Sequence, residues 1–222
     1  EKFALKENEE KKAIEAQIAE LQEKLKNIPP EDIVQPSPRI AIPSLQNASI
    51  TEESEIRELY ASLLANSMNK VVKDGVHPAF VEIIKQLSPD EAKILRYMSI
   101  FSSVPTISLR AENKDQSGIT VINCFSNIGE LMKCEKPYDI GKYFDNLERL
   151  GVIRKSGAFE SFTDKSIYEP LKSHEFIKEK EDSIQNSLDR NIPNILEGFV
   201  EITSFGRAFC DTCVTVELNI TI

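Results

Sequence analysis

The sequence of 222 residues contains no tryptophan, two histidines and eight scattered glycines. Histidine is the side chain best suited to proton transfer near neutral pH, and neither copy stands in a recognisable nucleophile motif. The glycines form no phosphate-binding loop. We therefore expect a protein that is not an enzyme, with no catalytic residues and no cofactor.

Long apolar runs are also missing. None approaches the ~18 residues needed to cross a bilayer, and no signal peptide is visible, so we expect a cytoplasmic protein with no membrane segment. Acidic residues outnumber basic ones, 36 against 27, which gives a net charge of −9. That charge opposes broad affinity for nucleic acid or anionic lipid. Because the chain begins with Glu1 rather than methionine, we expect a fragment or a processed form.

Four cysteines raise the question of a metal site. Cys210 and Cys213 have the spacing of half a zinc site, which Cys124 and Cys134 would complete. The wider spacing of the second pair matches no common zinc pattern, and the first pair lies one turn apart on an expected helix. We therefore predict buried, apolar cysteines and no metal.

Between Ser49 and Met98 the sequence predicts three consecutive helices. The first is capped by Ser49 with Glu52, or by Thr51, and ends at Gly75 or earlier at Asn69. Steps of three and four place its apolar residues in one stripe. These residues are Ile56, Leu59, Tyr60, Leu63, Leu64, Met68, Val71 and Val72.

The second and third helices have strong start signals. Pro78 suits the first turn of the second helix because a proline there loses no hydrogen bond. His77 before it is expected to cap or pack that start. Ser88, Pro89, Asp90 and Glu91 combine a serine cap, a proline at the first position and a glutamate at the third.

These segments resemble the signature of the Abi-alpha family. The residues that carry the resemblance are LYASLLAN at 59–66, VHPAFV at 76–81 and KQLSPDEA at 85–92, and the similarity extends from about Lys24 to Cys213. It implies a bacterial protein linked to abortive infection, in which an infected cell stops supporting phage growth. It implies no reaction. The motif residues are Asn66, His77, Pro78, Pro89 and Asp90; for Asn66, a hydrogen bond to a neighbouring loop and a ligand role both stay open.

The N-terminal segment predicts a charged helix from Phe3 to Ile28. Its apolar residues alternate by four and three, as in a coiled-coil seam of about two heptads. They are Ile14, Ile18, Leu21 and Leu25, followed by Ile28. We expect this helix to pack on its own domain or on a partner copy, or to tether a preceding segment. Residues 29–43 hold five prolines and predict an extended connector with an irregular strand at Arg39–Ile42.

The order of elements after Met98 is that of a winged helix-turn-helix. It comprises a helix at Pro89–Phe101, strands at Thr106–Arg110 and Ile119–Ile122, helices at Phe125–Cys134 and Ile140–Leu150, and wing strands at Val152–Lys155 and Phe199–Thr203 before a final helix. Gly151 is expected to end the second of these inner helices. A charged insertion, Glu160–Ile192, carries a helix at Leu171–Leu188 and a solvated His174. Residues Val214–Ile220 alternate as a strand.

A DNA-binding winged helix needs basic side chains for phosphates and polar groups for base edges. The candidates are Lys142, Arg149, Arg154 and Lys155, which form a possible interaction or nucleic-acid face. Asp139, Asp145 and Glu148 offset their charge. A DNA-binding regulator is therefore the second interpretation, after a protein-interaction role, because a fold alone does not define a function.

The sequence thus predicts an α+β, mainly α protein with a coiled-coil-like N-terminal helix, a helical core and a winged-helix-like half with a long wing insertion. We expect an arm at 1–28, a proline-rich linker at 29–48, a family-like domain at 49–213 and a C-terminal strand at 214–222. Within the domain, 49–88 is helical and 89–213 is winged-helix-like with insertion 160–192. The expected partner is another protein or a second copy bound through the N-terminal helix, in a phage-defence sensor or effector adaptor.

Overall fold

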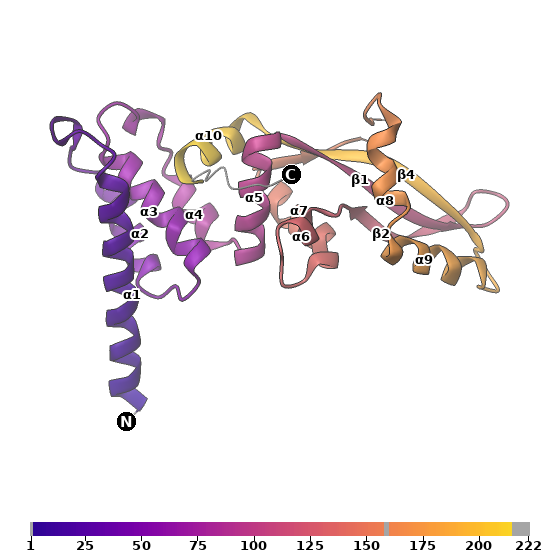
Figure 1. The fold of residues 1–222 in the computed structure, drawn as a ribbon, viewed down its shortest axis with the longest axis horizontal. Helices are drawn as coiled ribbons and strands as arrows, with labels where there is room; N and C mark the ends of the chain where they lie inside the picture. Colours follow the sequence, from indigo (N-terminus) through magenta and orange to yellow (C-terminus); the bar gives the residue numbers. More distant parts are fainter. Residues whose placement is uncertain (1, 158–159, 215–222) are drawn as a thin grey trace. The chain divides into compact units, whose positions relative to one another are not determined.

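The computed structural model of the protein describes residues 2–157 and 160–214. These residues form an α+β fold, mostly helical, with one four-stranded antiparallel sheet, which confirms the predicted class. The chain divides into two compact units (Figure 1). Unit 1 comprises residues 1–100 and 204–222, and unit 2 comprises residues 101–203. This division differs from the predicted domain boundaries, which stay a prediction.

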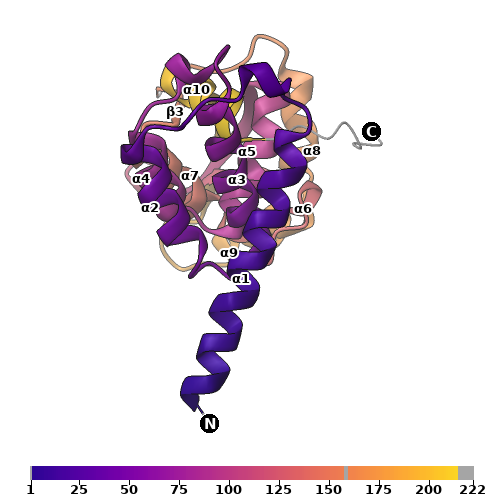
Figure 2. The same ribbon diagram turned by 90° about the vertical axis from the view of Figure 1, so that its left-hand side faces the viewer.

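Unit 1 is helical. Its helices are α1 (Lys2–Leu25), α2 (Pro38–Ala48), α3 (Ser54–Met68), α4 (Ala79–Lys85), α5 (Pro89–Phe101) and α10 (Ser204–Cys213), with short 3-10 turns at Pro30–Asp32 and Lys73–Gly75. Helix α3 lies at the centre and contacts α1, α2, α4 and α10 (Figure 2).

Helix α3 is buried on all sides. Every residue from Leu59 to Ala65 is buried, and these consecutive residues cover almost two full turns. The small side chains of Ala61, Ser62 and Ala65 let neighbouring helices approach closely. The prediction of a single apolar stripe was therefore too narrow.

The ends of α3 also correct the prediction. The helix begins at Ser54, after Glu53, and Ser49 instead follows the last residue of α2. It ends at Met68 with Asn69 as the C-terminal cap, which is the earlier of the two predicted ends. Val71 and Val72 lie beyond that end and are 74% and 44% exposed, so their assignment to the buried stripe was wrong.

The proline-rich segment contains a helix that the sequence interpretation missed. The strand expected at Arg39–Ile42 is wrong, because these residues lie in α2. Ser37 precedes that helix and Pro38 takes its first position, where a proline is compatible with the helix. Ile40, Ser44 and Ala48 are buried at steps of four, so α2 packs one face on unit 1.

Helices α4 and α5 form as predicted, and the bounds of α5 are the predicted ones. At the start of α5 the Ser88 backbone N–H donates to Glu91 Oε2 over 2.7 Å, and the Glu91 N–H donates to Ser88 Oγ over 3.3 Å. This reciprocal cap satisfies two N–H groups at the helix start. It explains why so short a sequence signal fixes the start of the helix.

Unit 2 contains the sheet. Its strands are β1 (Ser103–Glu112), β2 (Gly118–Phe125), β3 (Ile153–Lys155) and β4 (Ile192–Ile202), in the order β2-β1-β4-β3. Its helices are α6 (Ile128–Leu131), α7 (Ile140–Arg149), α8 (Glu169–Lys172) and α9 (Glu175–Gln185), with 3-10 turns at Pro137–Asp139 and Lys165–Tyr168. The predicted pairing of the last two strands is confirmed, since Ile153 pairs with Ile202 and Lys155 with Val200. Gly151, at φ +73°, follows α7 as predicted.

The insertion covers one face of the sheet. Figure 1 shows α8 and α9 beside the long strands β1 and β4, and Ile184 of α9 packs in a cluster with Leu109, Ala111 and Ile195. The single helix predicted at Leu171–Leu188 is wrong, because Ser173 and His174 interrupt it.

The second half of the chain differs in part from the elements that the sequence predicts. The helix predicted at Phe125–Cys134 is reduced to one turn, and Phe125 belongs to β2 instead. The winged-helix interpretation stays a prediction, because its first and last helices, α5 and α10, fall in unit 1. The strand predicted at Val214–Ile220 lies outside the described residues apart from Val214.

Candidate functional site

Two of the family-like motif residues, Asn66 and His77, lie where α3, α4 and α10 pack in unit 1, whereas Pro89 and Asp90 begin α5. Asn66, near the end of α3, donates from Nδ2 to the backbone oxygen of Thr212 in α10 over 2.7 Å. Segments far apart in the sequence are thereby joined by one side chain. The bond reaches α10 rather than the neighbouring loop that the simpler interpretation of Asn66 had named.

His77 fixes the start of α4. Its Nδ1 accepts a hydrogen bond from the backbone N–H of Ala79 over 3.1 Å, as the capping prediction requires. The imidazole also packs against Phe80 and Phe205, with ring centroids 5.9 Å and 5.7 Å away. Phe80 in turn meets Phe209 edge-on at 5.5 Å. An aromatic cluster therefore holds α4 against α10.

Two cavities are lined partly by residues of the loop between α3 and α4, and Val76 lines both. The smaller, about 290 Å³, is lined by Asn66, Gly75, Asp211 and Thr212 among others. The larger, about 580 Å³, opens onto the start of α2. Its lining consists of residues 35–40, Ser67, Lys73, Asp74, Val76 and Pro78. Charges of both signs line this larger cavity, so its chemistry selects no ligand class.

The predicted self-association seam on α1 is only partly covered. Ile14 and Ile18 are 44% and 47% exposed, whereas Leu21 and Leu25 are partly buried. Among the α1 residues whose burial is described, the one that packs most deeply is polar: Gln17 is 2% exposed. The N-terminal half of α1 projects beyond the other helices of unit 1 (Figure 2). The exposed Ile14 and Ile18, which follow this projecting half, are available to a partner.

Charged residues connect α1 to α3. Arg57 Nε lies 3.5 Å from Glu20 Oε1, and Lys24 Nζ lies 3.9 Å from Glu58 Oε1. Glu58 is shared, since its Oε2 accepts from Arg96 Nη2 of α5 over 2.5 Å. Two ion pairs, neither shorter than 3.5 Å, thus contribute to the contact between α1 and α3.

The four basic residues predicted as a nucleic-acid face are engaged inside unit 2. Arg154 pairs with Glu160 at 2.6 Å and Glu201 at 2.7 Å, and Lys155 pairs with Asp145 and Glu148. The carboxylates raise the pKa of Lys155 against the opposing effect of burial, which is the largest single influence.

The other two basic residues lie on α7. Lys142 pairs with Asp139 at 2.9 Å, and Arg149 donates to the side-chain oxygen of Asn146. Most of the positive charge on this face is thus matched by neighbouring carboxylates, which leaves little field to attract phosphates.

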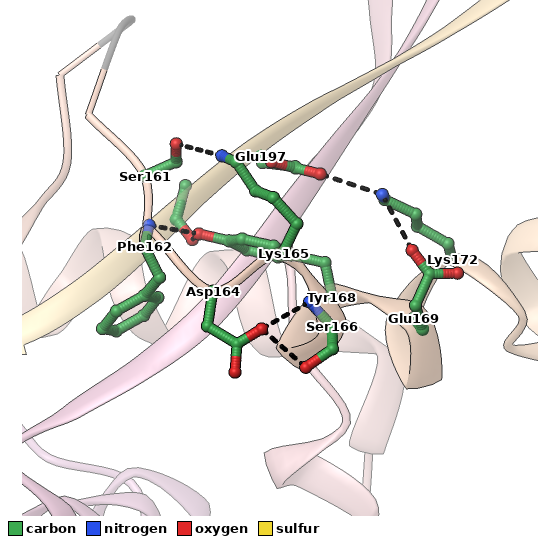
Figure 3. A network of polar contacts seen from close by, with 10 residues as sticks. Ser161, Phe162, Asp164, Lys165, Ser166, Tyr168, Glu169, Lys172 and Glu197 are labelled. Carbon is green, nitrogen blue, oxygen red and sulfur yellow. Dashed lines mark hydrogen bonds and ion pairs between the residues drawn. The ribbon is translucent and has the colours of Figure 1, made fainter.

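A second polar network fastens the insertion to β4 (Figure 3). Tyr168 is fully buried, and its hydroxyl donates to the Gly198 oxygen over 2.9 Å while accepting from the Phe162 N–H over 3.0 Å. Glu197 lies between Lys165 at 2.7 Å and Lys172 at 2.8 Å. These hydrogen bonds from two lysines lower the pKa of Glu197.

The solvated position predicted for His174 is wrong. Its side chain is 17% exposed, and its Nε2 lies 2.7 Å from Glu130 Oε2. Its Nδ1 accepts from the Phe176 N–H at the start of α9, and its ring meets Phe125. Like His77, this histidine caps a helix, so both histidines serve local structure.

All four cysteines are buried as free thiols. Burial raises the pKa of Cys210 to about 12 and that of Cys213 well above its usual range, so both stay protonated and poorly nucleophilic. Within the described residues, no group of three or more histidine, cysteine or acidic side chains is placed to hold a metal ion. The same part of the chain has no helix long and apolar enough to cross a membrane.

The sequence pattern described as abortive infection alpha matches residues 7–213, nearly the whole chain. The protein therefore belongs to the abortive infection alpha family, as the motif resemblance predicted. The match begins before Lys24, so it includes part of α1. Membership in this family points broadly to abortive infection, a form of phage defence.

Other comparisons add little. No curated protein matches the chain. One similar solved structure is an uncharacterised protein from the hydrocarbon-degrading marine bacterium Alcanivorax borkumensis SK2. It is 20% identical, with a TM-score of 0.43, and the match covers 61% of this chain and 92% of the other.

Proposed function

We propose that the protein acts in phage defence as a non-enzymatic interaction protein, a sensor or an effector adaptor, and that it self-associates through α1. The family supplies the biological context. The observation that carries the interaction role is the exposed pair Ile14 and Ile18, set one turn apart on a helix whose polar residue Gln17 is buried. Single exposed apolar residues are common, but a stripe at heptad spacing indicates a helical partner.

The other candidate roles have less support from the contacts. Both histidines cap helices, and burial keeps the Cys210 thiol protonated, which favours a binding role over nucleophilic catalysis. The carboxylates around Arg154 and Lys155 disfavour a DNA-binding role.

The self-association part is tested by the mass in solution. Light scattering over a concentration series should show wild-type mass rising with concentration, and the double variant Ile14→Glu/Ile18→Glu should stay monomeric. Ile50→Glu is the matched control, because Ile50 is 73% exposed in the same unit but lies outside α1. Equal mass for wild type and the double variant at every concentration would overturn self-association through α1.

The defence part is tested by phage challenge of a sensitive host carrying the full-length gene. Fewer plaques, with culture collapse only at high phage dose, are expected for wild type and for Ile50→Glu. The α1 double variant should restore plaquing. Unchanged plaquing by wild type across a broad phage panel would contradict the proposal. Salt-dependent DNA binding by the purified protein would favour the DNA-binding regulator instead.

A further inference from the structure

We propose that α1 is a releasable latch, which leaves α3 and pairs antiparallel with the α1 of a second copy. This inference rests on the self-association proposed above and adds its mechanism. Docked on α3, the helix is held through a polar face. Released, it presents the complete stripe of Ile14, Ile18, Leu21 and Leu25.

The docked contact leaves polar groups unpaired. Among the described residues, neither amide atom of the buried Gln17 has a hydrogen-bond partner. Glu20 Oε2 is likewise buried without a hydrogen bond in that part of the chain, and Arg57 Nε lies 3.5 Å from Glu20 Oε1 as an ion pair without forming a hydrogen bond. An unpaired buried polar group loses its hydration without compensation. The docked state is therefore weak relative to a fully matched helix contact.

The charges also fix how α1 is turned. Glu20 faces Arg57 and Lys24 faces Glu58, so α3 selects the polar side of α1. At 100° per residue the apolar stripe lies roughly a quarter turn away from that side. Rolling α1 to bring the stripe inward would place isoleucines against Arg57 and Glu58. The stripe therefore has no apolar counterpart on α3, and it fits a partner outside the unit.

The sequence of α1 selects a second copy in antiparallel orientation. In a parallel pair, the positions that flank the seam would set Glu10 against Glu15 of the other copy. An antiparallel pair sets Gln17 against Lys24 and Glu15 against Gln22, and it brings no like charges together. The same arrangement gives the Gln17 amide a partner that it lacks when α1 is docked.

Release is needed to complete the seam, because Leu21 and Leu25 are partly covered while α1 is docked. Two heptads make a weak helix pair, so pairing depends on concentration. A rise in the local concentration of the protein would therefore shift α1 from the docked to the paired state.

The decisive variant is Gln17→Leu in the full chain. Leucine removes the unpaired amide from the docked contact and should hold α1 on α3 more firmly. Hydrogen exchange of the α1 backbone amides in dilute protein should slow about tenfold. The dissociation constant for self-association should rise about tenfold, because fewer released helices are available.

Lys12→Leu is the control, since Lys12 is exposed on α1, lies away from both the docked side and the apolar stripe, and likewise becomes a leucine. It should leave exchange unchanged and should not weaken association. If Gln17→Leu leaves exchange unchanged or strengthens association, the latch is overturned. Circular dichroism of each variant confirms that the helices are retained.

The orientation is tested with single cysteines on α1. A mixture of Glu15→Cys and Gln22→Cys chains should form a cross-linked dimer on oxidation, whereas Glu15→Cys alone should form little. Failure of the mixed chains to cross-link, with efficient cross-linking of Glu10→Cys to Glu15→Cys instead, would overturn the antiparallel pair. If Ile14→Glu/Ile18→Glu abolishes association but Gln17→Leu does not change it, the proposed function stands and the latch fails.

Discussion

Two polar attachments in this molecule can be compared. In unit 1, α1 lies on α3 through ion pairs of 3.5 Å and 3.9 Å around Gln17, which has no hydrogen-bond partner among the described residues. In unit 2, residues 161–172 lie on β4 through Tyr168, which both donates and accepts, and through Glu197, which two lysines hold at 2.7 Å and 2.8 Å.

The comparison shows that polarity alone does not determine how firmly a segment is held. Short, fully paired hydrogen bonds compensate for the loss of water, whereas long or missing ones do not. We therefore expect the insertion to stay on its sheet and α1 to exchange between states. The predictions below test that difference.

Tyr168→Phe should have the largest effect. It leaves the Gly198 oxygen and the Phe162 N–H without their buried partner, and it should lower the free energy of unfolding of unit 2 by about 1–3 kcal/mol. Urea unfolding followed by circular dichroism measures the loss. Tyr138→Phe removes an exposed hydroxyl and should cost much less; equal losses would contradict the role assigned to burial.

Asn66→Ala should come next. This variant removes a 2.7 Å bond that joins α3 to α10, a matched polar contact inside unit 1. We expect a loss of about 1 kcal/mol in the free energy of unfolding. Asn186→Ala, which breaks an exposed local bond at the C-terminal end of α9, serves as the control in the same denaturation series. A loss no greater than that of the control would show that the bond between Asn66 and Thr212 does not stabilise unit 1.

Glu197→Gln should have a smaller effect, at most about 1 kcal/mol, that depends on pH. The pKa of Glu197 is lowered in the folded state, first by Lys165 and then by Lys172. Its contribution is therefore full above the unfolded pKa of a glutamate, about 4.3, and is lost as pH falls through the folded pKa. Unfolding midpoints at a series of acidic pH values should fall more steeply for wild type than for Glu197→Gln. Parallel curves would argue against stabilisation by the pairs of Glu197 with Lys165 and Lys172.

Lys24→Ala should have the smallest effect on stability. Its partner Glu58 lies 3.9 Å away and keeps Arg96, so we expect less than about 0.5 kcal/mol. Lys172→Ala, which breaks the 2.8 Å pair with Glu197, is the matched substitution and should cost more. If Lys24→Ala proves the costlier change in thermal unfolding, the comparison between the two attachments is reversed.

The helices that could be predicted were those with local start signals. Ser88, Pro89 and Glu91 define the start of α5 by contacts within four residues, and the structure has the predicted bounds. The same signal, serine before proline, stands at Ser37 and Pro38 and was overlooked among the surrounding prolines. Counting prolines hid a helix that the spacing of Ile40, Ser44 and Ala48 would have revealed.

Other features depend on distant parts of the chain and could not be predicted. The heptad pattern identified the apolar stripe of α1, but the charges on α3 decide which side of that helix is buried. Likewise, nothing near His174 indicates that it meets Glu130, which lies far earlier in the sequence. The basic residues Arg154 and Lys155 were correctly expected to be offset by acidic neighbours, but Glu160 and Glu201 were not among those named.

The chain enters and leaves unit 2 at one place. Ser103 pairs with Glu201, and the Ile202 N–H donates to the Ser102 oxygen over 2.8 Å. The two ends of the unit are thus neighbouring residues of one antiparallel ladder. A force that pulled these ends apart would break the hydrogen bonds of the β1–β4 ladder one pair after another from this end. It would not load all of them at once in shear. Unit 2 would therefore yield early under mechanical load, for example when a protease unfolds the chain by pulling on it.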